Sequence, residues 1–158
     1  MEVEITRLLT TELISVGLPG GTKADVLEHL FGMLKGHPGV VDFEEMRRAV
    51  LEREGIMSTG VGQGLALPHA KTEAVSDTIA ALVVTDSPVD FGSIDGQPVR
   101  IVFMLLGTVS ARSLHIKVLS RISRLMNRAS VRRELMGAES AHAALDVLSA
   151  AEEELLEH

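Results

Sequence analysis

Two runs of consecutive apolar residues stand out in the hydrophobic pattern of the chain, at residues 79–84 and 101–106. Neither run alternates with polar residues, which is typical of strands that are buried on both faces. We therefore predict strands over residues 78–85 and 99–106, joined by a loop over 86–98 that is rich in turn-forming residues. Burial on both faces requires helices on both sides of the sheet.

Apolar residues at helical spacing predict two helices before these strands. The first begins after Thr22, a good N-cap, and ends at the helix-breaking sequence of residues 36–38, Gly-His-Pro. The second begins after Asp42 and ends at Gly55, a residue type common at the C-terminal ends of helices. Arg53 then lies in the last turn of the second helix.

A long helix over residues 111–128 and two shorter ones beginning at Ser130 and Glu139 are predicted after the strands. The first 20 residues have no clear pattern, apart from a turn predicted over 17–21, Gly-Leu-Pro-Gly-Gly. Helices that alternate with buried strands indicate an α/β fold in one domain, with helices on both faces of the sheet. Residues 156–158, Leu-Glu-His, are interpreted as an expression-tag remnant, so the predicted domain spans 1–155.

The stretch from Arg53 to Ala70 gathers more anion-binding groups than any other part of the chain. Residues 55–64 hold four of the 14 glycines, which predicts an irregular loop. Residues 65–67, Leu-Ala-Leu, predict a short strand that Pro68 ends. His69 is therefore expected at the tip of a strand, facing a loop whose backbone N–H groups can bind a phosphate.

Composition narrows the classes of function. The formal net charge of -7 disfavours nucleic acid as the main partner, although residues 112–133 hold seven of the 15 basic side chains and no acid. That basic stretch is either a solvated helix face or a docking surface for an acidic partner. The chain has no cysteine, which excludes disulfides and cysteine nucleophiles. The longest apolar runs are six residues, whereas a membrane span needs about 20, so we expect a soluble, cytoplasmic protein without a signal peptide.

His69 is the candidate nucleophile, because a neutral imidazole is available near physiological pH. Phosphoryl transfer needs such a nucleophile together with cations and N–H groups around the phosphoryl oxygens. Groups of this kind near His69 in the sequence are Arg53, Ser58, Thr59, Gly60 and Gly62. A purely structural turn remains open as an alternative, and so does a weaker one, a serine hydrolase with Ser58 as nucleophile and His69 as base.

His115 is the second candidate, since it is predicted in the first turn of the long helix, directly after the second buried strand. A helix N-terminus favours a nearby anion, although a polar residue at a helix start can also be purely structural. The six histidines show neither HxxxH nor HExxH spacing, and no carboxylates cluster around them. We therefore expect neither a metal site nor a cofactor.

The sequence over residues 51–54 (Leu-Glu-Arg-Glu) and 58–69 (Ser-Thr-Gly-Val-Gly-Gln-Gly-Leu-Ala-Leu-Pro-His) strongly resembles a known family. This family is the enzyme IIA domain of the bacterial phosphoenolpyruvate-dependent sugar phosphotransferase system, fructose/mannitol type, which includes the nitrogen-regulatory homologue. The resemblance continues through residues 88–91, 95–99 and 114–116 and covers nearly the whole chain. It departs at residues 107–114, Gly-Thr-Val-Ser-Ala-Arg-Ser-Leu, where the family has a proline soon after the strand.

The resemblance implies a mixed β-sheet flanked by helices and a phosphohistidine at His69, on Nε2. By the same resemblance, Arg53 is the active-site arginine, His115 the second active-site histidine, and Ser58 and Thr59 the hydroxyl pair of the loop. The phosphoryl group would come from the phosphocarrier protein HPr or a homologue and pass to the cysteine of a IIB domain during sugar uptake. The alternative is a nitrogen-regulatory IIA-type protein, in which the phosphorylation state of His69 controls binding to regulatory partners.

Overall fold

The centre of the computed structural model is an antiparallel pair of long strands, β5 (Ile79–Val89) and β6 (Val99–Gly107). The structure describes residues 4–157, with side chains for 4–155. Every residue from Ile79 to Thr85 is buried, and in β6 only Arg100 is not fully buried. The two buried strands predicted from the apolar runs are thereby confirmed.

Shorter strands extend this pair on both sides into a six-stranded sheet. β1 (Ile14–Leu18) runs parallel to β5, at one edge. On the other side of β6 lie β3 (Leu65–Ala66) and β4 (His69–Lys71), both parallel to β6, and β2 (Gly60–Gly62) is antiparallel to β3. Parallel and antiparallel pairs occur together, so the predicted mixed sheet is confirmed.

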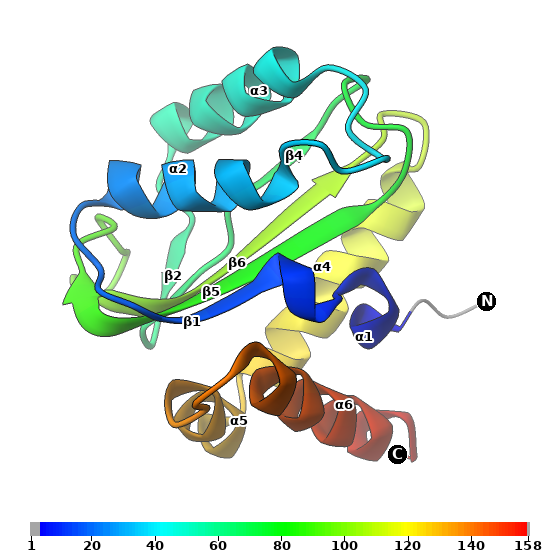
Figure 1. Ribbon diagram of the computed structural model, residues 1–158. Helices are drawn as coiled ribbons and strands as arrows, with labels where there is room; N and C mark the ends of the chain where they lie inside the picture. Colours follow the sequence, from blue (N-terminus) through cyan, green and yellow to red (C-terminus); the bar gives the residue numbers. More distant parts are fainter. Residues whose placement is uncertain (1–3, 158) are drawn as a thin grey trace.

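Helices cover both faces of the sheet, as Figure 1 shows. One face is covered by α2 (Lys23–Leu34) and α3 (Phe43–Ile56). The opposite face is covered by α1 (Ile5–Leu8), α4 (Arg112–Met126), α5 (Ala129–Met136) and α6 (Ala141–Glu157). A short 3₁₀ turn, η1 (Thr11–Leu13), leads from α1 into β1. Within residues 4–157, none of the helices combines the length and the apolar character that crossing a membrane requires.

The caps predicted for the two early helices are present. Thr22 Oγ1 accepts a hydrogen bond from the Asp25 N–H at 3.1 Å, and the Asp25 carboxylate accepts one from the Thr22 N–H at 3.0 Å. Asp42 Oδ1 accepts from the Glu45 N–H at 3.1 Å at the start of α3. These caps fix where α2 and α3 begin; α3 ends one residue beyond the predicted Gly55, and Arg53 lies in its last turn.

The structure corrects the sequence prediction at three places. The N-terminal region contains β1, and Gly17, which was assigned to a turn, lies within this strand with φ of 73°. The glycine-rich segment is partly regular, since β2 and β3 form a hairpin around Gln63. β5 continues to Val89 through the start of the predicted loop. His158, the last residue of the predicted tag remnant, lies outside the described residues.

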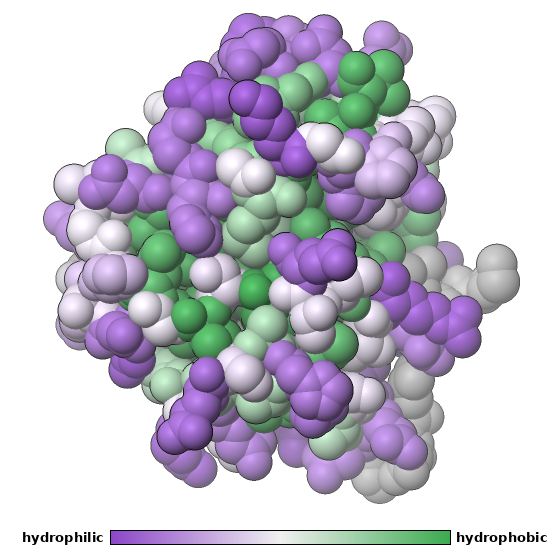
Figure 2. All heavy atoms as spheres, viewed as in Figure 1, coloured by the Kyte–Doolittle hydropathy of each residue, from purple (hydrophilic) through white to green (hydrophobic). Residues whose placement is uncertain are grey.

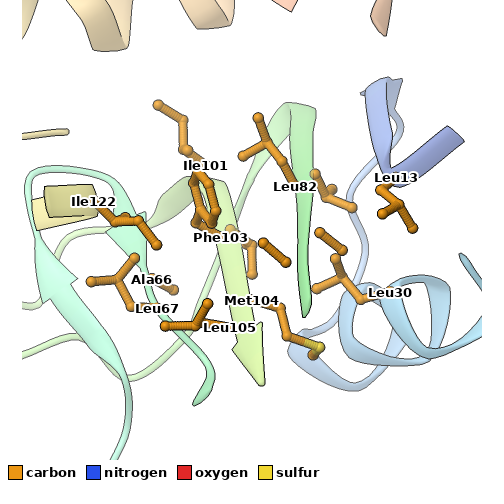
Figure 3. Packing of buried hydrophobic residues seen from close by; sticks show 14 of the residues in the cluster. Leu13, Leu30, Ala66, Leu67, Leu82, Ile101, Phe103, Met104, Leu105 and Ile122 are labelled. Atoms are coloured by element: carbon orange, nitrogen blue, oxygen red, sulfur yellow. The ribbon is translucent and has the colours of Figure 1, made fainter. Parts of the chain in front are cut away.

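The core is mainly aliphatic and lies on both sides of the central strands. Phe103 and Met104 are consecutive residues of β6 and are completely buried, so their side chains fill opposite faces of the sheet (Figure 3). Ile122 of α4 and Leu30 of α2 complete the packing from the two helical layers. On the surface seen in Figure 2, hydrophilic residues predominate and apolar residues are exposed in small patches between them.

Candidate functional site

His69 is the first residue of β4 and lies half-buried at the end of the sheet. Its Nδ1 lies 2.7 Å from the carbonyl oxygen of Leu67. A carbonyl oxygen can only accept, so Nδ1 carries the proton and donates it. In the neutral ring the lone pair is then on Nε2, which makes Nε2 the nucleophilic atom.

His115 lies beside His69, with 5.9 Å between the ring centroids and 45° between the ring planes. It occupies the first turn of α4 and is 3% exposed. Neither of its ring nitrogens has a hydrogen-bond partner within residues 4–155. Burial, with smaller contributions from His69 and Lys71, lowers the pKa of His115 from 6.5 to about 4, so this ring is neutral at pH 7.

Gly107, the last residue of β6, makes room for the His115 ring. A Cβ atom at this position would lie 2.5 Å from Nδ1 of His115. The absence of a side chain therefore allows the imidazole to pack directly against the end of the strand. His115 is held in its place by this contact and by the first turn of α4, where its N–H donates to the Ala111 carbonyl at 3.0 Å.

A cleft of about 530 Å³ opens in front of the two histidines. Its lining residues come from α3, from β4 with the residue that follows it, and from α4: Glu45, Arg48, Ala49, Glu52, Arg53, Ile56, His69, Ala70, Lys71, Thr72, His115, Ile116 and Leu119. Arg48 forms ion pairs with Glu45 and Glu52 at the rim. Within residues 4–155, Arg53 and Lys71 form no ion pair, so they provide positive charge to the cleft. Arg53 Nη1 donates to the Met57 carbonyl at 2.9 Å, which fixes its direction.

Lys71 is a cleft residue that sequence reasoning missed. It lies two residues after His69 in β4, and alternate residues of a strand point to the same side. Once a strand over residues 69–71 is assumed, this spacing is sufficient to place Lys71 next to His69. The sequence predicts a strand that ends at Pro68, which leaves residue 71 outside any predicted strand.

Arg53, His69 and His115, predicted from three separate segments, meet in this cleft, but the predicted phosphate-binding loop does not line it. Ser58 Oγ donates to the Phe91 carbonyl at 2.5 Å and accepts from the Gly60 N–H at 3.0 Å. Its hydroxyl forms no hydrogen bond with His69, which removes the support for a serine–histidine pair.

The remaining loop residues also have other roles in the fold. Thr59 donates to the Glu54 carboxylate through its N–H and its hydroxyl. Gly60 packs so closely that a Cβ would lie 2.3 Å from Ser93 Oγ, and Gly62 has φ of 103° in the β2–β3 hairpin. The phosphate-binding role of Ser58, Thr59, Gly60 and Gly62 therefore stays a prediction without a geometric argument. Within the described residues, no group of three His, Cys, Asp or Glu residues can hold a metal ion.

The mixed sheet presents His69 in a cleft that is also lined by a second histidine, His115, and by two cations, Arg53 and Lys71. The sequence matches a family described as "Phosphoenolpyruvate-dependent sugar phosphotransferase system, EIIA 2" over residues 7–151. The chain belongs to this family and is a component of the phosphotransferase-system type.

Both branches of the family occur among the relatives. The chain is 36% identical to the fructose-specific EIIA component of Haloferax volcanii over 92% of its own length and 95% of the relative's. It is 32% identical to the nitrogen regulatory protein of Pseudomonas aeruginosa, over 92% of this chain and 95% of that protein. The fructose-specific EIIABC component of Bacillus subtilis is 36% identical over 93% of this chain, which spans only 23% of that longer protein.

Solved structures agree with this assignment. The nitrogen regulatory protein IIA-Ntr of Neisseria meningitidis superposes with a TM-score of 0.84 and 30% identity, covering 91% of this chain and 98% of that one. The mannitol IIA enzyme of Escherichia coli, in its complex with phosphorylated mannitol IIB, gives a TM-score of 0.76 and 25% identity, covering 90% and 97%. The expected fold is thereby confirmed for this chain.

Proposed function

We propose that the chain is a phosphocarrier that accepts a phosphoryl group on Nε2 of His69 and passes it to a partner protein. The observation that carries this proposal is the 2.7 Å hydrogen bond from Nδ1 of His69 to the Leu67 carbonyl. It holds the proton on one nitrogen and leaves the other as the nucleophile, in a cleft with positive charge. Membership of the EIIA 2 family supports the same chemistry.

The donor in this proposal is phosphorylated HPr or a homologue, which carries the phosphoryl group on a histidine nitrogen. The lone pair of His69 Nε2 attacks phosphorus, the new N–P bond forms, and the N–P bond to the donor breaks with its electron pair returning to the donor ring. The proton stays on Nδ1 of His69 throughout, hydrogen-bonded to the Leu67 carbonyl. In the second half-reaction a thiolate of a IIB domain attacks phosphorus, an S–P bond forms, and Nε2 of His69 recovers its lone pair.

Three neighbouring side chains stabilise the transferring group in this mechanism. A phosphoryl group adds about -1.5 to -2 charges, and Arg53 and Lys71 offset this charge at the cleft. His115 is neutral, so it can donate one N–H to a phosphoryl oxygen without adding charge. Neither a metal ion nor a cofactor is needed for these steps.

A partner that reaches His69 would cover the cleft rim. Ile56 and Ile116 flank the cleft and are 77% and 59% exposed. Large exposed apolar residues around a functional cleft are typical of protein docking surfaces. The related mannitol IIA enzyme has been captured with phosphorylated mannitol IIB, which supports a IIB domain as the recipient.

The second candidate function is regulation, in which phosphorylation of His69 changes the affinity of this surface for regulatory proteins. The observation that favours it is the TM-score of 0.84 to the nitrogen regulatory protein of Neisseria meningitidis, against 0.76 for the mannitol IIA enzyme. Both functions use the same phosphohistidine. They differ in whether the phosphoryl group leaves for a sugar.

The test is incubation with phosphoenolpyruvate, enzyme I and HPr, followed by mapping of the acid-labile phosphate by mass spectrometry. One phosphoryl group on His69 supports the proposal, and a phosphate elsewhere, or none at all, overturns it. Addition of a fructose-type or mannitol-type IIB domain with its membrane domain and labelled sugar then separates the two functions. Label in sugar phosphate indicates transport, and retention on His69 indicates regulation.

A further inference from the structure

Glu54 is a buried carboxylate next to the cleft, and the phosphoryl-transfer steps above do not use it. It is 7% exposed, yet it forms one ion pair and accepts two hydrogen bonds. Its Oε1 lies 2.6 Å from Lys23 Nζ in the ion pair and accepts from the Thr59 N–H at 3.0 Å, and its Oε2 accepts from Thr59 Oγ1 at 2.7 Å. Burial of a carboxylate is unfavourable unless it is paired in this way, so the cluster is a closed, mutually dependent unit.

This cluster is linked to His69 by consecutive hydrogen bonds. Thr59, held by Glu54 through its N–H and hydroxyl, accepts at its carbonyl from the Leu67 N–H at 3.0 Å. The Leu67 carbonyl in turn accepts from Nδ1 of His69 at 2.7 Å. The carbonyl oxygen of Leu67 decides which nitrogen of His69 is free. Leu67 is held by Thr59, and Thr59 is held by Glu54.

A second branch of the same cluster reaches Arg53. The loop between α3 and β2 starts at Met57, whose carbonyl accepts from Arg53 Nη1 at 2.9 Å. Thr59 is two residues further along this loop, so its attachment to Glu54 limits how far the Met57 carbonyl can move. Lys23, the third member of the cluster, also lies 5.0 Å from the ring centroid of Phe91, and the Phe91 carbonyl accepts from Ser58 of the same loop.

We propose that Glu54 is a positioning residue for phosphoryl transfer: by holding Thr59 it fixes the Leu67 carbonyl that orients His69 and the Met57 carbonyl that orients Arg53. The proposal rests on the proposed function of His69. Glu54 does not touch the phosphoryl group, and it acts only through the two carbonyls. A purely structural role for Glu54 would change the stability of the fold but not the proton position on His69 in the folded protein.

The experiment compares Glu54→Gln and Thr59→Val with the full-length wild-type chain. Glutamine removes the charge opposite Lys23 and presents an NH₂ group to donors, while valine removes only the Thr59 hydroxyl. Glu28→Gln is the matched control, because Glu28 is an exposed carboxylate of α2 that pairs with Arg47 outside the cleft. Thr59→Ser keeps the hydroxyl and tests for rescue.

The first readout is the ¹⁵N NMR signal of the His69 ring in the unphosphorylated, folded protein at neutral pH. We expect the Nδ1–H form to dominate in the wild type and in Glu28→Gln. In Glu54→Gln we expect a mixture of both tautomers, with a smaller change in Thr59→Val that Thr59→Ser reverses. This readout needs no phosphoryl donor, so it decides the positioning role independently of whether HPr phosphorylates His69.

The second readout is the single-turnover rate of phosphorylation by phosphorylated HPr, measured at a temperature where all variants are folded. A displaced reacting group costs up to about 100-fold in rate, so we expect a loss of about 10- to 100-fold in Glu54→Gln. Unchanged His69 tautomers and rates in folded Glu54→Gln and Thr59→Val would overturn the proposal. If Glu54→Gln does not fold, Thr59→Val and its serine rescue decide it.

Discussion

The ring of His115 lies 5.9 Å from the ring of His69, and His115 is buried, neutral and without a hydrogen-bond partner within residues 4–155. An unpaired buried polar group costs about 1–3 kcal/mol. A phosphoryl oxygen on Nε2 of His69 would accept a hydrogen bond from His115 and relieve part of this cost. The pair therefore favours the phosphorylated state through a residue that never bonds to phosphorus.

Replacement of the two histidines separates their roles. We expect His69→Ala to abolish phosphorylation by HPr, because the nucleophile is removed. His115→Ala retains His69 and is expected to slow transfer by about 100- to 1,000-fold, the range for loss of a donor that stabilises developing charge. Intact-mass spectrometry after timed incubation measures both effects. A His69→Ala protein that still gained one phosphoryl group would contradict the assignment of the nucleophile.

The lowered pKa of His115 predicts how stability depends on pH. Between pH 6.5 and about 4 the unfolded chain binds a proton on this histidine and the folded protein does not. The free energy of unfolding should therefore fall as the pH is lowered through this range, by on the order of 3 kcal/mol from this residue. The stabilisation is fully present above pH 6.5.

Chemical denaturation of the wild type and His115→Gln from pH 7 to pH 4 isolates this contribution, because all other titrating groups are shared. The difference in unfolding free energy between the two proteins should change steadily across the range. Parallel pH profiles would show that His115 is as readily protonated in the folded protein as in the unfolded chain.

A methyl group at Gly107 should displace the His115 ring. The new Cβ would lie 2.5 Å from Nδ1 of His115, so Gly107→Ala is expected to destabilise the fold by about 1–3 kcal/mol and to slow phosphorylation of His69. Thermal unfolding and the phosphorylation rate are the measurements. The control is Gly32→Ala in α2. A Cβ added at Gly32 would have no described atom within 4 Å apart from its chain neighbours and the backbone of its own helix, so alanine should add about 0.5–1 kcal/mol of stability without affecting the rate.

Removal of the Lys71 charge should slow the phosphorylation of His69 and raise the pKa of His115. Lys71→Met keeps an unbranched side chain of similar length without the charge, and we expect slower phosphorylation with a weaker dependence on salt, because less positive charge faces the phosphoryl group. The positive charge of Lys71 lowers the pKa of His115, so this pKa should rise in the variant. NMR titration measures it. In the control Lys35→Met, whose side chain lies over Phe43 outside the cleft, both quantities should stay as in the wild type.

The fold could be predicted from the sequence where burial leaves a strong local signal. The apolar runs of β5 and β6 are of this kind, because both faces of these strands pack against helices. β1 was missed although Ile14, Val16 and Leu18 alternate with Ser15 and Gly17, because the pattern is only five residues long and Gly17 belongs to a glycine- and proline-rich segment typical of turns. Only its parallel pairing with β5, some 68 residues later in the chain, makes this segment a strand.

The sequence predicted three of the residues that line the cleft, but not the contacts that hold the surrounding loop in place. Arg53, His69 and His115 belong to recognisable sequence patterns, and the structure brings them to one cleft. The hydrogen bond from Ser58 to the Phe91 carbonyl and the ion pair between Lys23 and Glu54 join segments that no local pattern connects. Residue type alone therefore suggested that the hydroxyls of Ser58 and Thr59 are free to bind phosphate, whereas in the structure both hydroxyls donate to groups of the protein.

The basic stretch of residues 112–133 also forms tertiary contacts that the local sequence does not reveal. Arg121 pairs with buried Glu152, Arg128 pairs with Glu154, and Arg132 donates to the Met126 carbonyl. Three of its seven cations thus have partners inside the molecule, two of them carboxylates from α6. These contacts support neither a fully solvated helix face nor a continuous docking surface. The carboxylates that pair with the stretch, Glu152 and Glu154, lie about 25 to 30 residues later in the sequence.

β3 and β4 pair with the same edge of β6 in one register, and Leu67 and Pro68 lie between the paired positions. This break in the strand carries a lesson for protein engineering. A histidine placed alone in a continuous strand has no carbonyl two residues earlier that can turn toward its ring, so solvent would decide its tautomer. A designed sheet that is to present a single reactive nitrogen would therefore need the break before the histidine, and the carbonyl that this break exposes, as well as the histidine itself.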